Sequence, residues 1–185
     1  PHFLSTVVLV GMMTALLSPK NGIVNQFIKA LGGEPVYFMA EPEWFKSVYV
    51  WSGIWQNVGW NSIIYMAALA GIDPQLYEAA VVDGASKWDR MMHVTIPGIL
   101  PTAITLLILN TGKIMNVGFE KVFLMQNDLN LTSSEVISTY VYKSGLVGAE
   151  YSFSAAVGLF NSIINFILLI TVNKISSKTT ETSLW

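Results

Sequence analysis

The sequence predicts an all-α protein, a polytopic transmembrane helical bundle that carries one short helical hairpin outside the bilayer. Three observations support this fold class. Hydrophobic residues make up 52% of the 185 residues. Only 22 side chains are charged, 10 basic and 12 acidic, whereas a soluble domain of this length would carry about 46. Four stretches, each about as long as a membrane-spanning helix, contain no charged residue, and we expect each of them to contribute a span.

The four stretches without Asp, Glu, Lys or Arg are residues 1–19, 47–72, 91–112 and 151–173. A hydrocarbon core of about 30 Å needs about 20 residues of helix. We therefore predict membrane spans at about residues 3–18, 48–71, 98–115 and 153–172. One apolar window alone could be the core helix of a soluble protein, but four in one short chain argue against that alternative.

Composition also excludes several classes of function. A net charge of -2 leaves no basic face that could neutralise a phosphate backbone, so we expect no nucleic acid partner. The absence of cysteine excludes disulfides, thiolate metal ligands and cysteine nucleophiles.

The length of 185 residues fits one domain. Because the sequence begins at Pro1 with no basic region before its apolar run, no signal peptide is recognisable, and we expect it to be part of a longer chain.

The alternation of spans places two polar segments, Lys20–Lys46 and Lys113–Glu150, on one side of the membrane. The segment Asp73–Arg90 and the C-terminal tail lie on the other side. Cytoplasmic loops are usually the richer in Lys and Arg. The first side carries six such residues, Lys20, Lys29, Lys46, Lys113, Lys121 and Lys143, and the second carries four, Lys87, Arg90, Lys174 and Lys178. This difference is too small to fix the orientation.

The segment between the second and third spans predicts two short helices joined at a glycine. Asp73 can cap the first helix, with Pro74 at its first position. Gly84 suits a left-handed C-terminal cap. Ser86 and Asp89 are spaced as a capping pair for the second helix, which we expect to end at Pro97. Such a hairpin is a compact knob at the membrane surface, and we interpret it as a docking element.

The string EAAVVDGASKWDRMMHVTIP in this hairpin resembles the EAA signature of the permease subunits of binding-protein-dependent ABC importers. In that signature Glu-Ala-Ala is followed by a glycine after three residues and by two aliphatic residues and a proline further on. The matching positions are Glu78, Ala79, Ala80, Gly84, Val94, Ile96 and Pro97. Val94 and Ile96 are conservative departures from the usual isoleucine and leucine. The stretches PHFLS, GWNSIIYMAALAGIDPQLYEAA and NVGFEKVF look most like oligosaccharide or aldouronate permeases.

The resemblance implies a function and an orientation. The segment 73–97 would be a cytoplasmic loop that docks in a cleft of an ATPase as the coupling helix, with the C-terminus also cytoplasmic and the segments 19–47 and 116–152 extracellular. A typical member has six spans, so the chain looks like the last four. The implied coupling residues are Glu78, Ala79, Ala80, Asp83, Gly84 and Pro97. The implied partners are ABC ATPase subunits, a second permease subunit, an extracellular solute-binding protein, the lipid bilayer of the plasma membrane and a sugar substrate.

Polar side chains inside spans are costly and are therefore candidates for the substrate path. They are Asn57, Asn61, Asn110, Asn161 and Asn165. Amides can hydrogen-bond sugar hydroxyls, and Trp51, Trp55 and Trp60 could stack on sugar faces. The alternative is that the asparagines bond neighbouring helices and the tryptophans mark the membrane interface.

The sequence predicts a transport subunit and not an enzyme. Its one Gly-Lys pair, Gly112-Lys113, lacks the earlier glycine of a phosphate-binding loop. Neither an HExxH nor a GxSxG motif occurs, and the only histidines are His2 and His93. We therefore expect no catalytic residue, metal or cofactor in the chain, and ATP hydrolysis on a partner chain.

Two other classes of function remain as alternatives. A secondary transporter or channel would work without an ATPase, but such proteins usually carry buried acids or matched broken helices in their spans. The predicted spans contain no Asp or Glu. A membrane anchor that only docks partners would show no dependence of substrate flux on the span asparagines.

Overall fold

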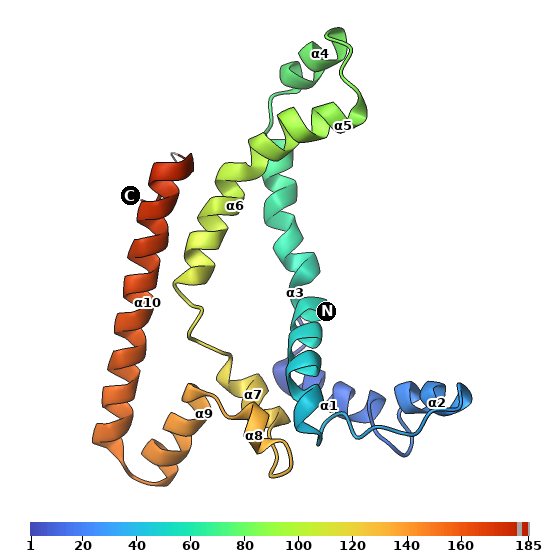
Figure 1. The fold of residues 1–185 in the computed structure, drawn as a ribbon, viewed down its shortest axis with the longest axis vertical. Helices are drawn as coiled ribbons and strands as arrows, with labels where there is room; N and C mark the ends of the chain where they lie inside the picture. Colours follow the sequence, from blue (N-terminus) through green and yellow to red (C-terminus); the bar gives the residue numbers. More distant parts are fainter. Residues whose placement is uncertain (181–182, 185) are drawn as a thin grey trace. The chain divides into compact units, whose positions relative to one another are not determined.

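The computed structural model describes residues 1–180 and 183–184, and every regular element within them is a helix (Figure 1). The all-α prediction is therefore confirmed. The chain divides into two compact units. The first consists of Pro1–Gly59 and Asn116–Leu159, and the second of Trp60–Met115 and Phe160–Trp185. The two longest helices, α3 (Pro42–Ala70) and α10 (Tyr151–Thr180), contribute residues to both units.

The first unit contains the larger part of the buried apolar core. Its remaining helices are α1 (Thr6–Leu16), α2 (Ile23–Ala30), α7 (Phe119–Met125), α8 (Leu131–Ser134), α9 (Ile137–Val141) and the π-helical turn η2 (Tyr142–Val147). The core joins α1 and α3 to α7 through Leu9, Val10, Met13, Phe45, Val122 and Met125. Because these residues are far apart in sequence, their packing fixes the segment after residue 116 against α1 and the start of α3.

The second unit carries the hairpin. It contains α4 (Pro74–Val82), α5 (Lys87–Arg90), the π-helical turn η1 (Met91–Thr95) and α6 (Ile96–Thr111), beside the later parts of α3 and α10. Figure 1 shows α4 and α5 folded back on one another beyond the start of α6. Leu169 of α10 packs against α6, because a Cβ placed on Gly112 would meet its side chain.

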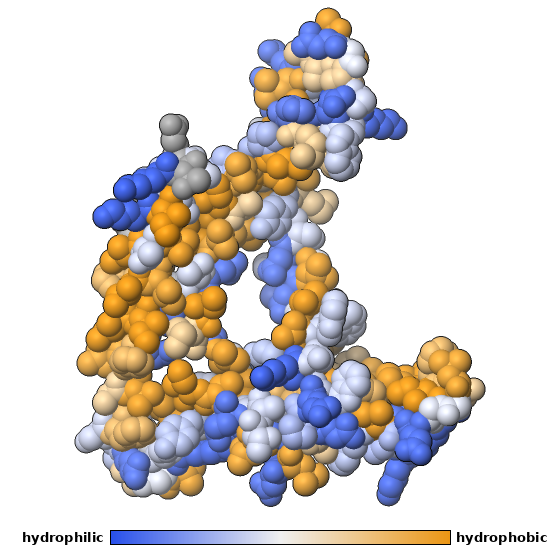
Figure 2. Space-filling view, viewed as in Figure 1, coloured by the Kyte–Doolittle hydropathy of each residue, from blue (hydrophilic) through white to orange (hydrophobic). Residues whose placement is uncertain are grey.

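Apolar side chains cover much of the surface of the long helices. Two helical stretches, Lys87–Thr111 and Tyr151–Lys178, are long and apolar enough to cross a membrane, and only 6% of each apolar window is buried. Figure 2 shows this hydrophobic surface over α6 and α10. An exposed apolar surface of this extent is typical of helices that face lipid or partner helices.

The predicted spans differ in how closely the helices match them. The fourth falls within Tyr151–Lys178, whereas the third lies within Lys87–Thr111 as far as residue 111 and extends four residues beyond that helix. The second lies within α3 except for its last residue, and the 29 residues of α3 are long enough to cross, although its glycines and amides lower its hydropathy. The first contains α1, whose 11 residues rise only about 16 Å. The four-span arrangement therefore stays a prediction.

One expectation about the hairpin is wrong. The helix that begins at Lys87 does not end at Pro97 but continues through η1 into α6 as far as Thr111. The physical reason is the π-helical turn, in which the N–H of Ile96 bonds the carbonyl of Met91. A π turn is wider than an α turn, so it accommodates the ring and the missing N–H of the proline that follows.

Candidate functional site

The first helix of the hairpin is fixed at both ends by local hydrogen bonds. At its start, Oδ1 of Asp73 accepts a hydrogen bond of 2.9 Å from the N–H of Gln75, and Pro74 occupies the first turn. At its end the chain turns at Gly84, which has a φ of +76°. The N–H of Ala85 bonds the carbonyl of Ala80 at 2.9 Å, as a Schellman cap requires. The predicted left-handed cap at Gly84 is confirmed.

The second helix begins at a reciprocal cap. The N–H of Asp89 donates to Oγ of Ser86 at 3.2 Å, and the N–H of Ser86 donates to Oδ2 of Asp89 at 3.0 Å. This is the predicted capping pair. With the turn at Gly84, it makes the link between α4 and α5 only a few residues long. Backbone groups at the facing ends of the two helices are therefore bonded within the turn that joins them.

A hydrogen bond ties the hairpin to the helix beneath it. The hydroxyls of Tyr77 in α4 and Thr95 in η1 are 3.0 Å apart. Thr95 directly precedes α6, so this hydrogen bond joins α4 to the residue at the start of that helix. The hairpin and α6 therefore have both a covalent and a hydrogen-bonded link.

The predicted coupling residues lie on the outside of the hairpin. Glu78, Ala79, Asp83 and Gly84 are exposed, Ala80 is half-buried, and Pro97 is exposed within α6. Large apolar side chains beside them are exposed as well, and these are Leu76, Val81, Val82 and Trp88. Val82 has 87% of its surface exposed. Small residues beside exposed apolar ones form a surface suited to docking on another protein.

The predicted path asparagines have different environments. In the first unit, Asn57 is half-buried and bonds the imidazole of His2 at 3.0 Å. In the second unit, Asn61 and Asn110 are exposed and Asn161 is half-buried. Asn165 is 8% exposed, and its side-chain oxygen accepts a bond from the backbone of Met115. At Asn165 the structure favours the packing alternative.

A second polar cluster lies on one face of α3 in the first unit. The Nζ of Lys121 in α7 donates a hydrogen bond of 2.8 Å to the carbonyl of Tyr49 and lies 4.7 Å from the centre of that ring. About two turns further along α3, Nδ2 of Asn57 donates to the carbonyl of Gly53 at 3.0 Å. The sequence counts Lys121 among the lysines of one side of the membrane but gives no sign of its contact with α3, which depends on tertiary packing.

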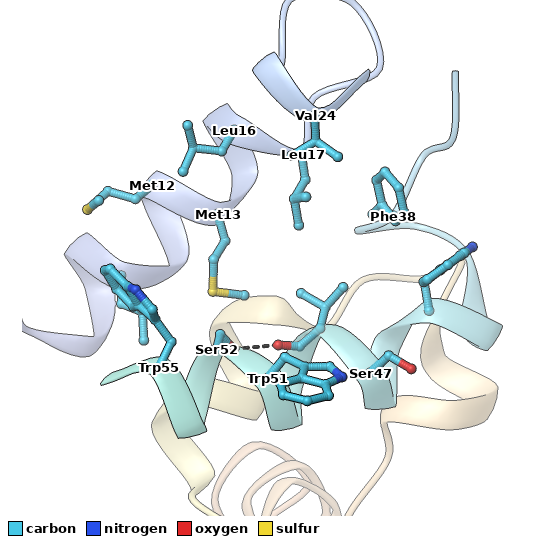
Figure 3. Close-up of a pocket in the computed structure, with 13 residues that line it drawn as sticks. Met12, Met13, Leu16, Leu17, Val24, Phe38, Ser47, Trp51, Ser52 and Trp55 are labelled. Atoms are coloured by element: carbon cyan, nitrogen blue, oxygen red, sulfur yellow. Dashed lines mark hydrogen bonds between the residues drawn. The ribbon is translucent and has the colours of Figure 1, made fainter. Parts of the chain in front are cut away.

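An apolar groove of about 420 Å³ lies between α1, α2 and the start of α3. Figure 3 shows Met13 and Leu17 pointing toward α3, where Trp51 and Trp55 lie. The hydroxyl of Ser52 is bonded within its own helix, to the carbonyl of Val48. Two of the three tryptophans that are candidates for sugar stacking, Trp51 and Trp55, therefore line an apolar surface, which suits contact with apolar groups.

The sequence reasoning missed a group of buried amides. Asn25 is fully buried, and its side chain bonds the carbonyls of Leu17, Ser18 and Val36 and the N–H of Val36. Asn130 is 1% exposed and bonds the carbonyls of Met39 and Met125. Both satisfy loop backbone, so their role is structural. Among the described residues, no group of three His, Asp or Glu side chains is placed to hold a metal.

Comparison with known proteins gives consistent matches over the chain. A family model described as "Binding-protein-dependent transport system inner membrane component" matches residues 1–181. The protein LplB of Bacillus subtilis is 42% identical over 178 residues, which is 96% of this chain and 56% of LplB. The polygalacturonan/rhamnogalacturonan transport system permease protein YteP of the same organism is 40% identical over all of this chain and 58% of its own length.

A solved structure is similar in both fold and sequence. It is a bacterial alginate ABC transporter in complex with an alginate pentasaccharide-bound periplasmic protein. One of its chains matches with a TM-score of 0.95 and 40% identity, over 100% of this chain and 64% of that one. The chain thus spans between 56% and 64% of the length of these three relatives.

Proposed function

Because the chain belongs to the family of binding-protein-dependent transport system inner membrane components, we propose that it is a permease subunit of an ATP-driven importer of oligosaccharides. The observation that carries the proposal is the hairpin geometry. Two capped helices meet at Gly84, expose Glu78 and Ala79, and connect through Thr95 to a helix of membrane-spanning length. This is the arrangement expected of an element that receives force from a partner.

In this proposal the chain couples ATP hydrolysis on its partner subunits to transport of the sugar and catalyses no reaction itself. Two ATPase subunits hydrolyse ATP, and their closure displaces the hairpins of this chain and of a second permease subunit. The Tyr77–Thr95 bond and the unbroken helix from Lys87 to Thr111 pass the displacement to the bilayer. The spans then rock from inward-open to outward-open and receive the sugar from an extracellular solute-binding protein.

We assign the hairpin and the C-terminal end of α10 to the cytoplasmic side of the plasma membrane, and residues 19–47 and 116–152 to the outside. Contacts within the second unit support this assignment. Asn165 bonds Met115, and Leu169 packs at Gly112, so α10 runs antiparallel to α6. The later part of α10 therefore runs toward the end of α6 that carries the hairpin. Residues 181, 182 and 185 of the tail lie outside the described residues.

The assignment of an oligosaccharide as cargo is supported by the relatives and by the amides of the spans. One relative is a permease for polygalacturonan and rhamnogalacturonan, and a solved relative transports alginate. Asn57, Asn61, Asn110 and Asn161 are the amides we assign to the substrate path. Their environments leave side-chain surface at Asn61 and Asn110 exposed, as contact with a passing sugar requires.

The test is ATP hydrolysis by the full-length permease, reconstituted with its ATPase and its second permease subunit and stimulated by loaded binding protein. Gly84→Val forces a β-branched residue into a left-handed backbone conformation, and Glu78→Arg reverses the exposed charge. We expect both to lose most of the stimulation. Gly11→Ala is the matched control, because Gly11 lies within a helix with open space around it.

Full stimulation in both hairpin variants would refute the proposal, provided that the complex assembles. The same preparation tests the alternative of a secondary transporter or channel. If the purified permease retains no ATPase and transports sugar on an ion gradient alone, that alternative is correct.

A further inference from the structure

One side of the short helix α2 is apolar and exposed. Helical spacing places Ile23, Phe27 and Leu31, the residue that caps the helix, on the same side. All three side chains are exposed, Leu31 by 74%. Figure 2 shows hydrophobic side chains gathered over α2. Contiguous apolar side chains of this size are seldom left in water, so this side of α2 calls for an apolar environment.

The other side of α2 is polar and is bonded to the loop that follows α1. Nζ of Lys29 donates to the carbonyl of Pro19 at 3.3 Å, and Nε2 of Gln26 donates to that of Asn21 at 3.2 Å. The buried side chain of Asn25 bonds carbonyls at the end of α1. These hydrogen bonds fix α2 beside the end of α1 and keep its apolar side away from the polar loop.

The apolar groove between α1, α2 and α3 adjoins this surface within the first unit. Leu16 of α1, Val24 of α2 and Trp51 of α3 are among the residues that line it (Figure 3). Apart from indole N–H groups, the polar side chains of its described lining are the hydroxyls of Ser47 and Ser52, and that of Ser52 bonds carbonyls of its own helix. The volume of about 420 Å³ lies in the range of pockets that hold small molecules, about 300–1,000 Å³.

The lining of the apolar groove favours a hydrocarbon over a polar occupant. A sugar or an extended peptide would lose hydrogen bonds to water that few groups in the groove replace. A hydrocarbon chain has no hydrogen bonds to lose, and its transfer into apolar surroundings is favourable. The flexible side chain of Met13 in the lining can adapt to such a chain. The groove therefore suits the acyl chain of a lipid.

Charge and aromatic residues place this region at the surface of a bilayer. The helices α1 and α3 lie in two of the predicted spans, and the first charged residue after α1 is Lys20. Tyr37 and the groove residue Trp44 are exposed, as is typical of the aromatic belt at a membrane surface. An amphipathic helix with a lysine on its polar side is typical of a helix that lies in the plane of the interface.

We propose that bilayer lipid covers this surface. The helix α2 lies in the membrane interface with Ile23, Phe27 and Leu31 among the acyl chains, and one acyl chain occupies the apolar groove. The inference rests on the membrane spans of the proposed function and adds a lipid site to them. In this role α2 is an anchor that holds the loop between the first two predicted spans against the membrane.

The test is photolabelling of the full-length complex in phosphatidylcholine nanodiscs. The probe is a phosphatidylcholine that carries a diazirine in its acyl chain, and mass spectrometry of peptides locates the lipid adducts after irradiation. We expect adducts on Phe27 and on the groove residues Leu16 and Trp51. Labelling of α10 without adducts on these three residues would overturn the inference.

A variant that fills the apolar groove tests its occupation. Val24→Trp places a larger side chain in the groove and should remove most of the adducts on Leu16 and Trp51. Ile23→Trp is the matched control, because Ile23 is the neighbouring position of α2, is exposed and is not part of the lining. It should keep the adducts. Undiminished labelling in Val24→Trp would contradict occupation of the groove, and if this variant does not assemble, the labelling of the unchanged complex decides.

A protein segment is the alternative occupant of this surface. The photoreactive residue p-benzoylphenylalanine, incorporated in place of Phe27, distinguishes the two because it cross-links to the molecule that covers that position. We expect a lipid adduct. A cross-link to the second permease subunit, to the binding protein or to another segment of the same chain would assign the surface to protein and overturn the inference.

Stimulation of ATP hydrolysis by loaded binding protein, measured on the same preparation, separates the lipid site from the transport function. If stimulation is present but the groove carries no lipid adduct, the lipid site fails while the proposed function stands. If the adducts are present without stimulation, the lipid site stands and the proposed function fails.

Discussion

The side-chain oxygen of Asn165 accepts a hydrogen bond of 3.3 Å from the backbone N–H of Met115. Met115 lies just beyond the end of α6, and whereas the N–H groups of Lys113 and Ile114 before it bond carbonyls of the helix, its own N–H bonds the side chain of Asn165. The amide from α10 therefore provides the acceptor for a backbone donor in the segment that follows α6. Beside it, Leu169 fills the space that a side chain at Gly112 would need. These contacts align α10 with α6 inside the second unit.

We expect Asn165→Leu to destabilise the protein by about 1–2 kcal/mol, because the N–H of Met115 loses its acceptor in an apolar environment. The change in the free energy of unfolding is measured in detergent, with circular dichroism as the signal that monitors unfolding. Asn110→Leu is the control, since Asn110 is exposed. A smaller effect at Asn165 than at Asn110 would show that the bond does not contribute.

Removal of the Tyr77 hydroxyl tests the link between the hairpin and α6. We expect Tyr77→Phe to reduce stimulated ATP hydrolysis about two- to tenfold, the range that corresponds to one neutral hydrogen bond. Basal hydrolysis should stay unchanged. Tyr140→Phe removes an exposed hydroxyl elsewhere in the chain and serves as the control. Equal stimulation in both variants would mean that the covalent connection alone transmits the motion.

The cap at Ser86 should control local stability in the hairpin. Ser86→Ala removes an acceptor for the N–H of Asp89 and should cost about 0.5–2 kcal/mol locally. Amide hydrogen exchange of residues 87–90 should become faster, while that of α10 should not change. Ser47→Ala, at an exposed position inside α3, should leave exchange in the hairpin unaltered.

Asn25 should be essential for folding of the first unit. Asn25→Leu keeps the approximate volume but leaves three carbonyls and the N–H of Val36 without this partner. Since each unsatisfied buried group costs about 1–3 kcal/mol, we expect little folded protein. Asn21→Leu, at an exposed position nearby, should express normally. Fluorescence-detected size exclusion of both variants measures the difference, and comparable yields would contradict the expectation.

The pair of Glu135 and Lys143 predicts a dependence of stability on pH. Burial alone would raise the pKa of Glu135, but hydrogen bonds from Thr139 and Lys143 outweigh it and lower the pKa below its ordinary value. A carboxyl with a lowered pKa stabilises the fold above its unfolded pKa of about 4.3, and this stabilisation is lost as the pH falls through the folded pKa.

We therefore expect unfolding temperatures in detergent to fall when the pH drops below about 4.3. Glu135→Gln should show a smaller fall, because its amide does not titrate. Glu120→Gln, at an exposed acid, is the control and should keep the behaviour of the unchanged protein. The same pH dependence in all three proteins would show that other carboxyls are responsible.

The hairpin could be predicted in detail because its signals are local. Asp73 and Ser86 cap helices through hydrogen bonds that reach only two or three residues, and Gly84 is required by a single backbone angle. Pro97 shows the limit of such local reasoning. Its ring is a helix terminator in an α-helical register, but a π-helical turn accommodates it, and residue type alone does not indicate that turn.

The polar residues show a second limit. A sequence shows that Asn57, Asn165 and Lys121 lie in or beside apolar stretches, but it does not show their partners. Asn165 bonds Met115, which is 50 residues away, and Lys121 bonds Tyr49, which is 72 residues away. Because hydrogen bonds require contact at about 3 Å, an assignment to packing or to a substrate path needs the tertiary structure.

The sequence by itself determined the class of the protein and the position of the hairpin, because the scarcity of charge and the caps of short helices act over a few residues and do not depend on the fold. Only the tertiary structure decided which amides satisfy backbone groups and which cation lies beside a neutral face of α3. Those pairings arise where distant segments pack together, and the free energy of each polar group depends on the partner that it meets there.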